Sequence, residues 1–183
     1  RGTLLLAFSV PCIISMIINS IYNIVDQIFI GKGVGIIGNA ATNVIFPIII
    51  ICNALAGLVG NGAAANLSLR LGEGKKDEAK KSIGSSITLL FIISILVVII
   101  FELLLPNLVY AFGCTKNVYS SAMTYGRIIV FGSFFMIVYS GLSQIIRADG
   151  SPKYSMVCLL VGAILNIILD PIFIFTFNMG VAG

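Results

Sequence analysis

The chain alternates long uncharged apolar stretches with short polar segments. The uncharged stretches cover residues 2–25, 33–69, 82–101, 128–146 and 154–169. A run of about 20 apolar residues is enough for a helix to cross the hydrocarbon core of a bilayer, and these stretches approach or exceed that length. The pattern therefore predicts five membrane-spanning helices, roughly over residues 3–30, 37–70, 83–105, 118–146 and 155–177.

The composition indicates an integral membrane protein and excludes an ordinary soluble domain. Of the 183 residues, 58% are hydrophobic and 10% are charged, whereas about 25% of the residues of a soluble domain are charged. The predicted fold class is an all-α polytopic membrane protein. The chain starts without Met and ends in a glycine-containing turn that leads toward another helix, so we expect a segment of a longer protein.

Positive residues collect in alternate segments between the predicted helices. Arg1 precedes the first helix, and the segments after the second and fourth helices hold Arg70, Lys75, Lys76, Lys80, Lys81, Arg147 and Lys153. The other segments hold Lys32 and Lys116. Because cytoplasmic loops are enriched in Lys and Arg, we predict a multi-pass protein of the cytoplasmic (plasma) membrane with a cytoplasmic N-terminus. Anionic lipid headgroups satisfy the net charge of +4, so no nucleic-acid partner is expected.

A carboxylate interrupts the first predicted helix. Asp26 follows a long uncharged stretch, and an aspartate at the centre of a membrane helix costs about 2.5 to 3.5 kcal/mol on insertion scales. Asn19 and Asn23 share a helical face with Asp26, and Tyr22 lies beside them. The two asparagines either hold helices together or line a polar cavity. The cost of Asp26 indicates a function.

A second carboxylate lies in the fifth predicted helix. Asp170 follows Asn166 by one helical turn, so the two side chains share a face. Pro171 comes next and has no N–H, so the carbonyl of Ile167 loses its helical partner. Carboxylate, amide and carbonyl oxygens together suit a hard cation. If the first and fifth helices are neighbours, Asp26, Asn166 and Asp170 form one cation site.

Two further features of the sequence concern helix packing. The second predicted helix is rich in small residues between Asn53 and Ser68, which lets a neighbouring helix approach closely and slide or tilt. Arg127, in the fourth helix, has two interpretations: its side chain extends to the headgroups, or it pairs with a carboxylate. Glu102 lies near the outer end of the third helix, where headgroups are expected to solvate it.

Enzyme motifs are absent or misplaced. Residues 33–38 match the letters of the dinucleotide-binding pattern G-x-G-x-x-G, but they follow a membrane helix instead of a strand, and the downstream acid is missing. The sequence has no Walker A motif, so nothing indicates ATP hydrolysis, and it has no His for a metal-hydrolase or Ser-His-Asp scheme. We therefore expect a protein that is not an enzyme and has no organic cofactor.

Four segments carry a family resemblance: residues 22–31 (YNIVDQIFIG), 71–74 (LGEG), 146–152 (IRADGSP) and 166–171 (NIILDP). In order and spacing they resemble the multidrug and toxic compound extrusion (MATE) transporters, over essentially the whole chain. The resemblance implies twelve helices in two six-helix lobes around a V-shaped cavity. This chain would be most of the first lobe, with the second lobe as its missing partner. The implied activity is export of amphipathic, often cationic compounds, driven by inward H⁺ or Na⁺.

The resemblance also implies which residues bind the coupling ion, H⁺ or Na⁺. The first-lobe cation site of that family uses an aspartate of the first helix and an asparagine and an aspartate of the fifth, which match Asp26, Asn166 and Asp170. In some members a hydroxyl of the sixth helix completes this site. Two tyrosines of this chain fall where the family has tyrosines near the pocket. The candidate cavity-lining residues are Tyr22, Asn23 and Tyr125.

Two alternative functions share features with this chain. A lipid-linked oligosaccharide flippase of the same superfamily has the same architecture, but such proteins tend to line the cavity with basic residues, and these helices offer only Arg127. An intramembrane aspartyl protease also needs two helix-borne aspartates. Neither Asp26 nor Asp170 lies in the Tyr-Asp or Gly-x-Gly-Asp sequences typical of that class.

Overall fold

Long helices make up nearly all of the structure, a computed structural model that describes residues 2–33 and 35–177. The elements are α1 (Gly2–Gly33), α2 (Gly35–Gly72), α3 (Lys76–Ala111), α4 (Lys116–Ala148), α5 (Pro152–Pro171) and a π-helical turn, η1 (Ile172–Thr176). All five α-helices are long and apolar enough to cross a membrane. The predicted fold class is therefore confirmed, and the described residues contain no strand.

The third helix is longer than the sequence pattern predicts. We expected it over residues 83–105, whereas α3 begins at Lys76 and ends at Ala111. The charged residues at its start are helical, because the α2–α3 turn needs only a few residues. Gly74 takes a φ of 76°, a left-handed conformation that costs glycine little. The N–H of Lys75 donates to the carbonyl of Arg70 at 2.9 Å and closes the turn.

The fifth helix changes its geometry directly after Asp170. α5 ends at Pro171, and η1 continues the chain, with the N–H of Phe177 donating to the carbonyl of Ile172 at 3.0 Å. Proline lacks the N–H that an α-helix requires, and single π-helical turns are common near functional sites. The irregular backbone therefore lies next to one of the two candidate acids.

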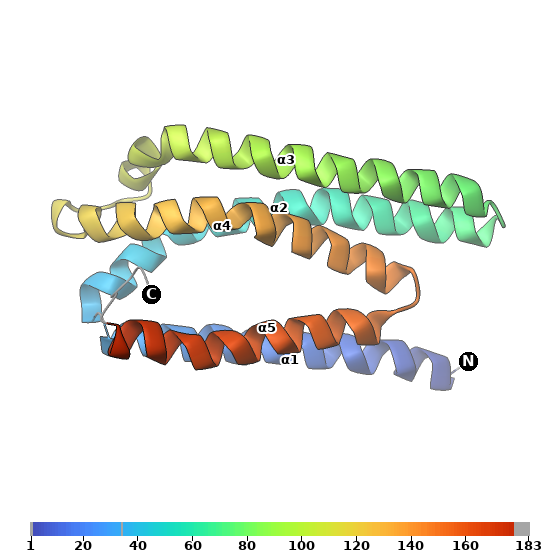
Figure 1. The fold of residues 1–183 in the computed structure, drawn as a ribbon, viewed down its shortest axis with the longest axis horizontal. Helices are drawn as coiled ribbons and strands as arrows, with labels where there is room; N and C mark the ends of the chain where they lie inside the picture. The colour runs from blue at the N-terminus through green and yellow to red at the C-terminus, as the bar shows by residue number, and fades with distance from the viewer. Residues whose placement is uncertain (1, 34, 178–183) are drawn as a thin grey trace.

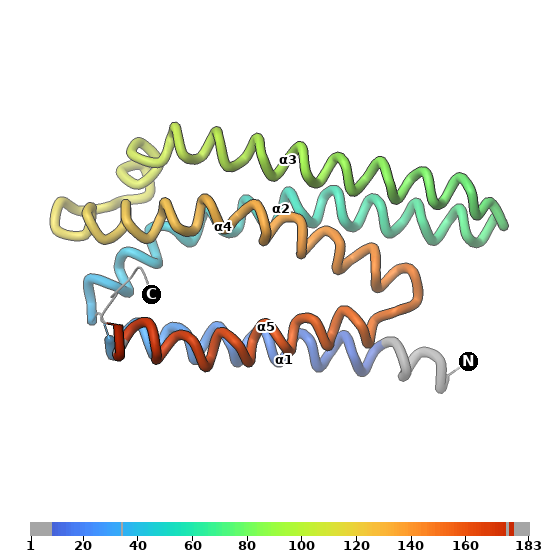
Figure 2. The backbone as a smooth tube through the Cα atoms, viewed as in Figure 1, coloured from blue at the N-terminus to red at the C-terminus, as the bar shows by residue number. Residues whose placement is uncertain are grey.

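The helices form two packing groups. α2, α3 and α4 pack on one another, whereas α1 packs mainly along α5 (Figures 1 and 2). Contacts between the groups are fewer and involve α1 with α2 and α4 with α5. The cluster of buried apolar side chains lies within the first group and includes Ile45, Leu90, Leu105 and Ile137. The first group is therefore the apolar core, and α1 with α5 forms a separate pair.

The small residues of α2 serve the contact with α4. A Cβ atom built on Gly60 would lie 2.9 Å from the Cα of Gly141, so the two backbones approach closely there. By contrast, a Cβ on Gly57 would meet only the side-chain nitrogen of Asn61, at 3.6 Å. The expected close approach is thus present, and its partner is α4.

A buried polar network joins α4 to α5. The hydroxyls of Ser143 and Ser155 are hydrogen-bonded at 2.5 Å, and the Nε of Arg147 donates to the Ser155 hydroxyl at 3.1 Å. Both serines are buried. Because unpaired buried polar groups are costly, this network favours contact between the two packing groups near the α4–α5 turn.

The basic segments share one end of the bundle. The start of α1, the α2–α3 turn and the α4–α5 turn lie together at one end of Figure 1, and the start of α2 and the α3–α4 turn lie at the other. Alternate connections are therefore separated in space, as a multi-pass helical protein requires. The side of the membrane that each end faces stays a prediction.

Candidate functional site

The packing of α1 along α5 brings the two intramembrane acids together. Both helices start at the same end of the bundle and run in the same direction (Figure 1). Asp26 lies in the last third of α1, and Asp170 is the penultimate residue of α5. The two carboxylates lie close enough for their charges to interact. The condition set by the sequence, that the first and fifth helices are neighbours, is met.

The α5 part of this cluster contains polar oxygens that lack partners. Asp170 is only 6% exposed, and its Oδ2 atom accepts no hydrogen bond from the described residues. The Oδ1 atom of Asn166 is likewise buried and without a partner among those residues. Unsatisfied buried oxygens are costly, and in native proteins they point to an ion, a water or a functional role.

Two tyrosines complete the cluster. Tyr22, half-buried on α1, interacts electrostatically with both Asp26 and Asp170. Tyr125, half-buried on α4, interacts with Asp26 and Tyr22. Tyr125 therefore links the α2–α3–α4 group electrostatically to Asp26 of the α1–α5 pair. Its place in the sequence, about 100 residues after Asp26, does not reveal this interaction.

Asn23 is oriented differently from the acids. Its side chain is exposed, and its Nδ2 atom donates to the carbonyl of Asn19 at 2.6 Å and to the Asn19 Oδ1 at 3.3 Å. These bonds stay within α1. The structure thus pairs Asn23 with its own helix, and its predicted cavity-lining role stays a prediction.

The donor set of the cluster suits a proton or a small hard cation. Two carboxylates, an amide oxygen and a phenol are all oxygen donors, which Na⁺ and similar cations prefer. A proton is also compatible, because two close carboxylates do not readily hold two negative charges and one of them takes up a proton. Either ion neutralises charge that is expensive inside a bilayer. The residues present therefore fit the predicted coupling ion without selecting between H⁺ and Na⁺.

Arg127 pairs with a carboxylate, which is the second of its two predicted interpretations. Its Nε lies 3.4 Å from the Oε1 of Glu102, while the arginine side chain is 63% exposed. The other oxygen of Glu102 is buried and accepts no hydrogen bond from the described residues, so the expectation that headgroups solvate this carboxylate is wrong for that atom. The reason is that α4 packs on α3 along this stretch and places a guanidinium beside the acid.

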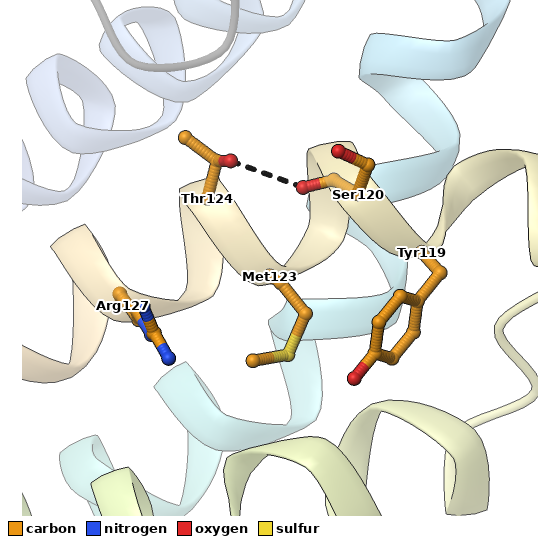
Figure 3. A pocket seen from close by; sticks show the side chains of 5 residues that line it. All are labelled: Tyr119, Ser120, Met123, Thr124 and Arg127. Atoms are coloured by element: carbon orange, nitrogen blue, oxygen red, sulfur yellow. Dashed lines mark hydrogen bonds between the residues drawn. The ribbon is translucent and has the colours of Figure 1, made fainter.

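A hollow of about 330 Å³ lies against the first turns of α4. Figure 3 shows its lining side chains: Tyr119, Ser120, Met123, Thr124 and Arg127. The hydroxyl of Thr124 donates to the carbonyl of Ser120 at 3.0 Å, within the same helix. Arg127 is already paired with Glu102. Two of its polar side chains, Thr124 and Arg127, are therefore engaged by the protein itself.

Asn39 is a polar residue that sequence reasoning did not single out. Its Oδ1 atom is buried without a hydrogen-bond partner among the described residues, and its Nδ2 atom lies 3.1 Å from the position that a Cβ on Gly31 would take. Asn39 thus packs against the end of α1. A single asparagine near a helix start is common in any sequence, so no pattern distinguished it.

These features define a multi-pass helical membrane protein with an intramembrane pair of acids. The MatE family model matches residues 11–172. The chain therefore belongs to the MatE family, the multidrug and toxic compound extrusion transporters, as the four motif segments predicted.

Similar proteins include curated and structurally solved members of the family. Multidrug export protein MepA of Staphylococcus aureus is 33% identical over 178 residues, which cover 96% of this chain and 39% of MepA. The MATE multidrug transporter DinF-BH, solved in complex with a dye, is 39% identical with a TM-score of 0.94, over 99% of this chain and 41% of that chain. A multidrug resistance MATE transporter of the MOP superfamily, solved in an outward-facing conformation, is 28% identical with a TM-score of 0.92, over 98% and 40% of the two chains. The chain thus spans about two fifths of the length of these relatives.

Proposed function

We propose that the full-length protein is an antiporter that exports amphipathic, often cationic compounds across the cytoplasmic membrane in exchange for H⁺ or Na⁺. The observation that carries this proposal is the pair of charge-coupled acids, Asp26 and Asp170, with the unpartnered oxygens of Asp170 and Asn166 beside them. The printed descriptions of MepA as a multidrug exporter and of DinF-BH as a multidrug transporter support the substrate class.

The geometry suggests how an ion is coupled to substrate movement. The acids lie on the α1–α5 pair, and Asp26 also interacts electrostatically with Tyr125 of α4, so the charge on the acids acts on both packing groups. An uncompensated pair of carboxylates favours an arrangement that admits water or ions, whereas a neutralised pair tolerates closer burial. A ligand shifts a conformational equilibrium by its difference in affinity for the two states. Ion binding is therefore proposed to favour one arrangement of α1 and α5, and substrate binding the other.

Transport by the full-length protein in liposomes tests this proposal. The protein is reconstituted, a fluorescent cationic dye is added, and dye movement is followed after a H⁺ gradient or a Na⁺ gradient is imposed. Movement against the dye gradient under one of the two ions supports an ion-coupled antiporter and identifies the ion. Dye movement that ignores both gradients contradicts it, and translocation of a lipid-linked oligosaccharide in place of dye favours the flippase alternative.

We further propose that the N-terminus is cytoplasmic, as the basic segments suggest. Lys76 begins α3 and Lys116 begins α4, at opposite ends of the bundle. In a cysteine-free full-length background, Lys116→Cys is expected to react with an impermeant thiol reagent added to intact cells. Lys76→Cys is expected to react only after permeabilisation. The reverse pattern of labelling would show that the topology is inverted.

Asn166 is expected to contribute less than either acid. Asn166→Ala removes an amide oxygen but no charge, and a neutral polar contact is worth about 0.5–1.5 kcal/mol, so coupled efflux should fall by a factor of about 2 to 12. Asn66→Ala is the matched control, because Asn66 is also an asparagine in a spanning helix but donates to Ser82 within the α2–α3–α4 group. Equal losses for the two variants in the dye assay would argue against a role of Asn166 in the ion site.

A further inference from the structure

The start of α3 presents three exposed lysines: Lys76, Lys80 and Lys81. We propose that they form a docking surface for anionic phospholipid headgroups in the leaflet that the α2–α3 turn faces. These residues are termed the α3 basic patch. The proposal rests on the membrane-spanning fold and is independent of ion coupling and of substrate.

The glutamates next to the patch are already engaged by other cations. Arg70 contacts Glu78 at 2.8 Å and Glu73 at 3.5 Å, and Lys75 contacts Glu73 at 3.1 Å. The three lysines of the patch form no ion pair with any described residue, and Asp77 forms none with them. The folded turn therefore neutralises its glutamates internally and leaves the patch charges without a partner.

The position of the three lysines at the N-terminal end of α3 makes an external anion more favourable. The patch occupies the first two turns of α3, where the helix dipole gives a partial positive charge and cationic side chains are unfavourable, although Asp77 and Glu78 of the first turn complement that dipole. The Lys residues there repel both one another and this end of the helix. An anionic surface next to the patch relieves that repulsion, and each basic residue near an anionic leaflet gains enough to change binding about fivefold.

The face of α3 shows that part of the patch points toward lipid. Lys81 precedes Ile92, Ile99 and Leu103 by spacings that place all four on one side of a helix that turns about 100° per residue. The three apolar side chains are 50%, 51% and 74% exposed, as expected for a surface that meets hydrocarbon chains. Lys81 thus continues the lipid-facing side of α3 at the end that carries the positive charge.

The depth of the patch matches the headgroup layer. The apolar part of α3 begins near Ile87, which is about 9 Å from Lys81 along the helix axis at 1.5 Å per residue. The headgroup region extends about 5–8 Å beyond the hydrocarbon core on each side, and a lysine side chain extends several bonds from its backbone. The ammonium groups of Lys80 and Lys81 therefore reach phosphate groups, whereas a soluble acidic partner would have to displace lipid to reach Lys81.

A local lipid-binding measurement tests the proposal. Full-length protein in a tryptophan-free background carries Ser85→Trp, an exposed position one turn from Lys81. It is placed in vesicles of phosphatidylcholine or of equal parts phosphatidylcholine and phosphatidylglycerol, and one lipid at a time is supplied with brominated chains that quench tryptophan. We expect quenching to show severalfold preference for phosphatidylglycerol at low salt, and a smaller preference at high salt because the charges are screened.

The patch variant and its controls decide the outcome. K76Q/K80Q/K81Q is expected to bring the preference close to one, while Lys32→Gln and Lys116→Gln, at the other end of the bundle, leave it unchanged. A probe at that other end, Leu103→Trp, is expected to show no preference. An equal preference in the native patch and in the triple variant overturns the proposal, as does equal quenching by both lipids. In vesicles of phosphatidylcholine alone, unchanged quenching by the brominated lipid confirms that the variants remain inserted.

Discussion

Asp170→Asn in the full-length transporter is expected to abolish ion-driven efflux while leaving the protein folded in the membrane. Asn keeps the shape of the side chain and removes its charge, and Asp170 is the more deeply buried of the two acids. Coupling between two sites is typically worth 1–3 kcal/mol, a factor of about 5 to 150, so efflux under an imposed gradient should fall within or beyond that range. Asp26→Asn is expected to have the same effect.

The controls for this prediction separate coupling from folding. Asp149→Asn changes an exposed carboxylate at the α4–α5 turn and is expected to retain efflux. Dye binding to the Asp170→Asn protein should persist, since the substitution removes a charge of the proposed ion site and keeps the shape of the side chain. Gradient-driven efflux at the wild-type rate by both aspartate variants would refute the assignment of the acids to the ion site.

The sequence was sufficient to predict the helices and to single out the two acids, but not to show that α1 and α5 are neighbours. Uncharged apolar stretches indicate spanning helices, because the bilayer disfavours charged side chains and backbone groups without a hydrogen-bond partner. The intramembrane acids were conspicuous for the same reason: Asp26 and Asp170 break long apolar runs. Helical periodicity placed Asn166 on the face of Asp170, and its unpartnered oxygen in the structure agrees with that placement. These features depend only on neighbours within one helix.

Contacts between helices could not be predicted from the sequence. The small residues of α2 indicate that another helix approaches closely, but they do not show which one. The structure identifies α4 as that helix. The pairing of Arg127 with Glu102 depends on how α4 is rotated against α3, which no local pattern determines. The same is true of Tyr125, which lies on α4 but interacts electrostatically with Asp26 of the other packing group. Each of these facts is set by tertiary packing.

The division into two packing groups indicates which helices move when the charge on the acids changes. α2, α3 and α4 share an apolar core, whereas α1 and α5 lie outside that core and make fewer contacts with the other three helices. A change of charge at Asp26 and Asp170 therefore acts on the less firmly attached pair of helices. The proposed transport cycle requires that the first group stay intact, and its closest backbone contact is the place to test that requirement.

Gly60→Ala is expected to destabilise the protein through the α2–α4 contact. The added Cβ would lie 2.9 Å from the Cα and 3.0 Å from the carbonyl oxygen of Gly141, so backbone atoms must move apart. Overpacking of this kind costs about 1–3 kcal/mol, which exceeds or offsets the gain of about 1 kcal/mol in helix propensity when alanine replaces glycine. The midpoint of thermal unfolding of the purified full-length protein in detergent should therefore fall.

Gly62→Ala is the matched control for that measurement. Gly62 lies two residues along the same helix, and a Cβ built there meets no atom within 4 Å, so only the propensity gain remains and the midpoint should stay the same or rise. Gly141→Ala is also expected to lower the midpoint, because its Cβ would lie 2.5 and 2.7 Å from the two methyl groups of Leu90, whose side chain is fully buried. Equal midpoints for Gly60→Ala and Gly62→Ala would show that the contact between α2 and α4 is looser than the structure indicates. The proposal that the α2–α3–α4 group stays intact during transport would then be contradicted.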